Sequence, residues 1–162
     1  MYNAAALLDI HARAHESLRR LIVFCGNLTD SELRRPLTGF GFSTVVRQLE
    51  HTIGAELYWQ TVVMRGYTEE ASLPELPDVA AIETFRAQTA SATRWYLERA
   101  SDAELNSPRV MISDPGKTRL LRPADVIMRV VTHMFNHQGQ VLAMCRTIGK
   151  PNDTHSVDYP ID

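Results

Sequence analysis

The sequence predicts an all-α fold, a bundle of four long helices with a short β-hairpin between the third helix and the fourth. Two observations support this. Four long segments repeat apolar residues at helical spacing, and each is bounded by residue types that start or stop helices. Only two short segments have the character of strands. Because sites in helix bundles are built from side chains that point inward, functional residues are expected in the core.

The first two helices are expected over residues 3–25 and 43–65. Gly26 follows the first apolar repeat and is a plausible C-terminal stop. Ser43 follows a polar, glycine-rich connection and is expected to cap the second helix through its side-chain oxygen, while Gly66 is expected to end that helix.

The third and fourth helices are expected from Val79 to about Ala100 and from Pro123 to Gly149. Asp78 is a good N-cap for the third helix, and proline suits the first turn of the fourth. Between them, residues 109–112 and 118–121 flank a turn-forming stretch and predict a hairpin. The tail from residue 152 to 162 is expected to pack as an extension rather than to form another helix.

Composition narrows the class of protein. The chain has 162 residues, which fits one domain over residues 1–162 with a hydrophobic core of its own. Its net charge of −2 and the scatter of its 17 basic residues argue against a nucleic-acid partner. The apolar runs are too short to span a membrane, and no secretion signal is visible at the N-terminus. We therefore expect a cytoplasmic protein.

The two cysteines, Cys25 and Cys145, stand alone inside helical patterns. A disulfide framework would need more cysteines, and no Cys-x-x-Cys pair is present. We expect two buried, reduced thiols.

The pair His133 and His137 carries the clearest chemical signal. The two residues lie four apart, so they project from one face of the fourth helix, which is also its apolar face. Two such imidazoles suit one metal ion, although two buried histidines satisfied by hydrogen bonds would give the same pattern. The sequence His-Met-Phe-Asn-His lacks the glutamate of a zinc-protease motif, which excludes that enzyme class.

His51, on the second helix, is a third candidate ligand. It can point at the fourth helix if the bundle closes on that side. Three neutral imidazoles leave a coordination position open, whereas structural zinc sites fill all four positions from the protein. An open position would imply chemistry or ligand binding.

Three other histidines are weaker candidates as ligands. His11 and His15 are also four apart, but they lie in a helical segment that we expect to be half-exposed, so they are weak candidates. His155 is expected to be solvated.

These motifs resemble the DinB/YfiT-like superfamily of bacterial four-helix bundles over nearly the whole chain. The matching patterns are His51-x-x-x-Ala55-Glu56-x-Tyr58-Trp59, His133-x-x-x-His137-Gln138-Gly139-Gln140 and the ending Asp158-Tyr159. Relatives usually carry arginine at the position of Gln138, so this chain departs from the family pattern at the expected pocket rim.

The resemblance implies a bundle with a long crossover, frequent homodimers and one metal held by His51, His133 and His137. The metal would be Zn, Ni, Mn or Fe. Family members include thiol S-transferases that act on low-molecular-weight thiols, and others described as metal-dependent hydrolases. We therefore expect a metal-dependent enzyme with a small-molecule substrate; the alternative is a non-catalytic, stress-associated metal-binding dimer.

Four further residues are expected near the pocket, each with a functional and a structural interpretation. Glu56 is a candidate general base or imidazole-orienting carboxylate, but a salt bridge to an arginine of a neighbouring helix is the favoured explanation. Gln140 is a candidate to reach the metal or its water, or else a buried amide satisfied by the backbone. Tyr58 and Trp59 are expected mainly to pack.

Overall fold

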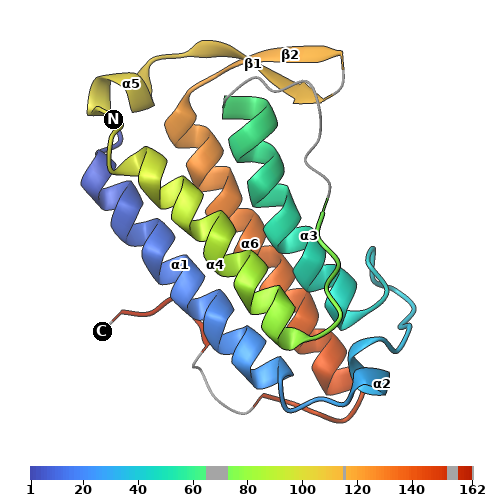
Figure 1. Cartoon of the computed structure of the whole chain (residues 1–162). Coiled ribbons are helices and arrows are strands. Elements are labelled where there is room, and N and C mark those ends of the chain that lie inside the picture. The colour runs from blue at the N-terminus through green and yellow to red at the C-terminus, as the bar shows by residue number, and fades with distance from the viewer. Residues whose placement is uncertain (65–72, 115, 153–156, 162) are drawn as a thin grey trace.

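Four long helices lie side by side in the computed structural model, which describes residues 1–64, 73–114, 116–152 and 157–161 (Figure 1). Within these residues the long helices are joined by two short helices, one π-helix and two strands. The elements, in chain order, are α1 (Ala4–Cys25), α2 (Asp30–Leu33), α3 (Val45–Tyr58), the π-helix η1 (Trp59–Met64), α4 (Val79–Leu97), α5 (Asp102–Asn106), β1 (Arg109–Asp114), β2 (Lys117–Leu121) and α6 (Pro123–Thr147). The predicted all-α class with a small hairpin is confirmed.

The packing of the long helices decides which side chains can meet. Helix α1 contacts α4 and α6, and α3 contacts α6 and α4. The hairpin and α5 cover one end of the helices, and α2 lies at the other end (Figure 1). Helix α3 therefore has one side toward α6 and another toward α4.

Side chains cap the helices close to where the sequence predicts. Asn3 accepts a hydrogen bond from the Ala6 amide at 3.1 Å, and Asp78 accepts one from Ala81 at 2.8 Å. The predicted cap at Ser43 is wrong by one residue, because Thr44 has the extended backbone of a cap and accepts from the Arg47 amide.

Two helices end differently from the prediction. The second predicted helix is α-helical only to Tyr58 and continues as the π-helix η1; its predicted end at Arg65 and Gly66 lies outside the described residues. Helix α4 ends at Leu97 rather than near Ala100. Gly149, with φ of +80°, lies just beyond the end of α6 and closes that helix as expected.

The hairpin pairs as predicted. Strands β1 and β2 are antiparallel, with Val110 opposite Leu120 and Met111 opposite Arg119. Met111 is buried while Val110 and Leu120 are exposed, so one face of the hairpin covers the helices.

The apolar core contains both cysteines. Cys25 and Cys145 are free, fully buried and hydrogen-bonded to each other. This confirms the prediction of buried, reduced thiols. Among the described residues no helix is both long and apolar enough to cross a membrane.

The described part of the C-terminal tail packs against the helices. The Ser17 hydroxyl approaches the Val157 carbonyl, and Arg13 donates to the Pro160 carbonyl at 3.0 Å. The Tyr159 ring lies 6.1 Å from that of Phe135. The expected packed extension is present over residues 157–160, whereas Ile161 is exposed and His155 lies outside the described residues.

Candidate metal centre

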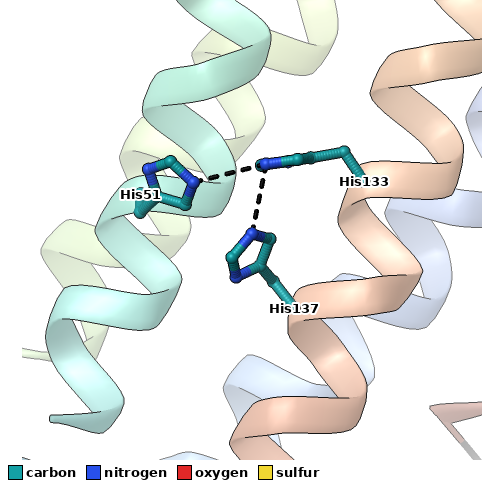
Figure 2. A group of neighbouring side chains, drawn as sticks. All are labelled: His51, His133 and His137. Atoms are coloured by element: carbon teal, nitrogen blue, oxygen red, sulfur yellow. Dashed lines mark hydrogen bonds between the residues drawn. The ribbon is translucent and has the colours of Figure 1, made fainter. Parts of the chain in front are cut away.

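The three predicted histidines converge where α3 faces α6. His133 and His137 occupy successive turns of α6, and His51 projects toward them from α3 (Figure 2). The helices bring them together because apolar residues on both helices pack beside the histidines, Leu49 and Ile53 on α3 and Met134 and Val141 on α6.

The ring nitrogens approach within the range of shared ligands. His133 Nε2 lies 3.3 Å from His51 Nε2 and 3.1 Å from His137 Nε2. The nitrogens of the three residues all lie within 4.8 Å of one another. For comparison, zinc–nitrogen bonds of about 2.05 Å at tetrahedral angles place two ligand nitrogens about 3.3 Å apart. The donor set and its spacing therefore fit one tetrahedral divalent ion.

A glutamine behind His137 fixes which ring nitrogen is free. His137 Nδ1 lies 2.7 Å from Gln48 Oε1, an acceptor, so the ring hydrogen is on Nδ1 and Nε2 keeps its lone pair. Gln48 is held in that orientation because its amide nitrogen donates to the Phe42 carbonyl and to Gln140 Oε1. This is the arrangement that commonly orients a metal-binding histidine.

The surroundings favour neutral imidazoles. Burial, and after it the charges of His137, His51 and Arg129, together lower the pKa of His133 to about 4. Burial also lowers the pKa of His51, with a contribution from His137, and that of His137. The Phe42 ring stacks on His51 at a centroid distance of 4.0 Å and shields one face of this imidazole. Neutral imidazoles keep the lone pairs that a cation needs.

A small cavity adjoins His51. Its volume is about 140 Å³, and it runs along α3 from His51 toward η1. Its lining is mostly apolar and consists of His51, Gly54, Ala55, Leu57, Tyr58, Thr61 and Leu73. The cavity gives a small molecule space beside one of the candidate ligands.

A second cluster of similar composition lies between α1, α3 and α4. His11 and His15 are buried, with 2% and 4% of their surface exposed, which corrects the prediction of a half-exposed pair. His11 Nε2 lies 2.8 Å from Glu56 Oε1, and His15 Nε2 lies 2.8 Å from Glu56 Oε2. Helix α4 covers them, and sequence periodicity on α1 alone does not show that cover.

The hydrogen-bond partner of His15 Nδ1 distinguishes this cluster from the first. Arg86 Nη1 lies 3.3 Å from His15 Nδ1, and a guanidinium can only donate. Nδ1 therefore accepts, Nε2 carries the hydrogen, and that hydrogen donates to Glu56. His15 Nε2 has no lone pair for a metal, so the second cluster is a hydrogen-bonded network with an ionised carboxylate at its centre.

The two candidate catalytic residues have different surroundings. Glu56 orients imidazoles, as one interpretation expected, but those of His11 and His15 rather than the three convergent histidines; it also accepts from Thr93 at 2.7 Å. The alternative was a salt bridge to an arginine; among the described residues the ion-pair partners of Glu56 are His11 and His15. Gln140 accepts a hydrogen bond from Gln48, which in turn contacts His137.

Gln138 points away from the three histidines. Its side chain is buried between α6 and α1, where Ser17 Oγ lies 2.9 Å from Gln138 Oε1. Its Nε2 has no hydrogen-bond partner among the described residues. A glutamine at this position therefore packs against α1 and does not line the rim of the cavity.

Sequence reasoning missed Gln48 and Phe42. Gln48 lies one turn before His51, which is a signal for a neighbouring face of the same helix but not for contact with His137. Phe42 lies in the glycine-rich connection, where no periodicity predicts the direction of a side chain.

The family comparison covers nearly the whole chain. The protein-family model described as DinB family matches residues 1–160. The chain belongs to the DinB family. A comparison with curated proteins finds no match. Membership in the DinB family agrees with the helical fold and with the cluster of histidines between α3 and α6.

Proposed function

We propose that this DinB-family protein binds one divalent transition-metal ion through Nε2 of His51, His133 and His137. The observation that carries the proposal is the convergence of these nitrogens, at 3.1 and 3.3 Å from His133 to its two neighbours. The acceptor behind His137 supports it, because that hydrogen bond leaves Nε2 free to bind.

Hydrogen bonding alone explains the cluster less well. His137 Nε2 is an acceptor, so His133 Nε2 would have to carry a hydrogen to satisfy it. That single hydrogen makes one straight hydrogen bond and leaves the contact with His51 poorly satisfied. One cation satisfies three lone pairs at once, and this favours a metal.

The ligand set supports several metals and an open position. Imidazole nitrogen suits Zn, Ni and Fe, with Mn also possible, so availability would decide between them. Among the described residues the group holds three ligands, one fewer than a closed tetrahedral site. When bound, the ion would lower the pKa of a coordinated water or thiol and make a nucleophile available near neutral pH.

We propose that the protein is a metal-dependent enzyme, either an S-transferase for a low-molecular-weight thiol or a hydrolase. The cavity beside His51 supports this, since a purely structural site needs no adjoining space. The alternative is a non-catalytic metal-binding protein that works as a stress-associated dimer. A homodimer is expected in either case, and light scattering would measure it.

Metal analysis of untagged protein, prepared without chelators and reloaded with zinc or nickel, tests the proposal. We expect about one ion per chain in the wild type and none in His133→Ala. The matched control is His11→Gln, which alters the other histidine pair and should retain the ion. A wild type that takes up no metal would contradict the proposal. If the wild type does bind metal, thiol-transfer and ester-hydrolysis assays on the loaded protein would distinguish the two reactions.

A further inference from the structure

Arg129 lies one helical turn before His133 on α6. A separation of four residues corresponds to a rise of about 6 Å along the helix and places both side chains on the same face. Arg129 is exposed to solvent, and its charge is close enough to contribute, after burial and the two neighbouring histidines, to the lowered pKa of His133. A guanidinium therefore stands beside the candidate metal centre, on the side toward η1.

Trp59 holds this guanidinium in place. The Arg129 guanidinium carbon lies 5.0 Å from the centre of the Trp59 ring, within the range of a cation–π contact. Such stacking uses the flat face of the guanidinium and leaves its N–H groups, which lie in its plane, free to donate. Those N–H groups match the two oxygens of a carboxylate.

No carboxylate of the described residues pairs with Arg129. The acid best placed by spacing is Asp125, one turn earlier on α6, but Arg122 already binds both of its oxygens, at 2.8 and 2.9 Å. A cation held by an aromatic ring, one helical turn from His133 and without an acidic partner among those residues, is suited to bind an anion from solution.

The spacing along α6 limits the size of that anion. A molecule that binds Arg129 at one end and reaches His133 with the other has to bridge a single helical turn, a rise of about 6 Å. The cavity of about 140 Å³ beside His51 is lined by residues of α3 and η1 and by Leu73, and Arg129 is not among its lining residues. Helix α6 thus offers, along one face, a guanidinium and two of the three imidazoles.

We propose that Arg129 is a substrate-binding residue that selects small molecules with a carboxylate. In this arrangement the carboxylate pairs with Arg129 while the reactive end of the molecule reaches the three histidines. The inference rests on the proposed metal site and narrows its substrates to short, anionic compounds.

Cobalt-substituted protein gives a direct binding assay. The d–d bands report that cobalt is bound, and a sulfur-to-cobalt charge-transfer band reports a bound thiol. The two probes are 3-mercaptopropionate and its neutral amide, 3-mercaptopropionamide, which have nearly the same shape and differ in charge. We expect the wild type to prefer the carboxylate, and the preference to decrease as salt screens it.

Three variants test whether Arg129 causes the preference for the carboxylate. Arg129→Gln should reduce the ratio of the two affinities about tenfold, as expected for the loss of a hydrogen-bonded charge, without changing affinity for the amide. Arg129→Lys should retain part of the preference, because lysine keeps the charge but not the paired N–H groups. The matched control is Arg119→Gln, which removes an exposed arginine on β2 and should leave the ratio unchanged.

Cobalt bands without a preference for the carboxylate would overturn the inference while leaving the metal site intact. So would a preference that Arg129→Gln does not change. A loss of preference in Arg119→Gln equal to that in Arg129→Gln would assign the effect to net charge and would also overturn it. Absence of the cobalt bands in the wild type would contradict the proposed metal site itself.

Discussion

His137 Nδ1 lies 2.7 Å from Gln48 Oε1, whereas His15 Nδ1 lies 3.3 Å from Arg86 Nη1. The first imidazole has an acceptor behind it and the second has a donor. This difference leaves His137 Nε2 with a free lone pair and His15 Nε2 without one. The two clusters are otherwise alike, because each draws two histidines from one helix and a third residue from α3.

Replacing Gln48 should therefore weaken metal binding. Gln48→Leu removes the acceptor for His137 Nδ1 at similar volume, and we expect the affinity for zinc to fall about 10- to 100-fold. Gln48→Glu keeps an acceptor and should retain wild-type affinity or increase it. Competition with a chromophoric chelator measures both variants. Equal losses in Gln48→Leu and Gln48→Glu would indicate general damage to the helix rather than loss of this hydrogen bond.

Replacing Glu56 should reduce stability without removing the metal. Glu56→Gln leaves one of the two imidazole N–H groups without its acceptor, and we expect a loss of about 1.5–3 kcal/mol in the free energy of unfolding. Urea unfolding measures it. The control Glu50→Gln breaks only a surface pair with Arg47 on the same helix and should cost less than about 1 kcal/mol. Loss of metal in Glu56→Gln would show that the two clusters are not independent.

Acid should destabilise the fold in two overlapping stages. Burial is the main reason that the pKa of His15 lies below its ordinary value of 6.5, so the unfolded chain binds this proton more readily and stability falls as pH decreases below 6.5. Burial acts against the Glu56 carboxylate, but the electrostatic attraction of His15 and hydrogen bonds from His11 and His15 outweigh it and hold its pKa well below the ordinary 4.5.

The Glu56 contribution is therefore present above pH 4.5 and is lost as pH falls below that value. Unfolding free energies measured from pH 8 to pH 3 should decrease throughout the acid range, and Glu56→Gln should flatten the part below 4.5. A wild-type curve that rises toward acid would contradict this assignment of charges.

Metal removal should lower the melting temperature and leave the helices intact. The three histidines lie beside an apolar core that does not depend on them, and a bound ligand adds stability only according to its concentration and affinity. Circular dichroism before and after chelation tests this. Complete unfolding on chelation would favour the structural role over the enzyme.

Periodicity predicts the four long helices because each one has an apolar face and residues that cap it. It does not predict the π-helix, since Trp59–Met64 continues the pattern of α3 and the wider turn depends on neighbours distant in sequence. Thr44 and Ser43 carry the same hydroxyl group, so sequence alone could not choose between them as caps.

The same limit applies to the sites. Spacing pairs His133 with His137, the place of His51 on the second helix makes it a third candidate, and the family resemblance supports all three. The burial of His11 and His15 depends on α4, and the partner of Glu56 depends on how α1 and α3 face each other. These are contacts between helices, and a single helix pattern contains no information about them.

Helix α3 supplies one residue to each polar cluster, and these residues, His51 and Glu56, are about 140° apart around its axis. Apolar contacts alone tolerate sliding and rotation of a helix among its neighbours. A shift of one residue would turn α3 by about 100° and break both clusters together, leaving buried charge and nitrogen lone pairs unsatisfied. The two clusters together therefore favour one rotational position of α3 over other compact arrangements of the same helices.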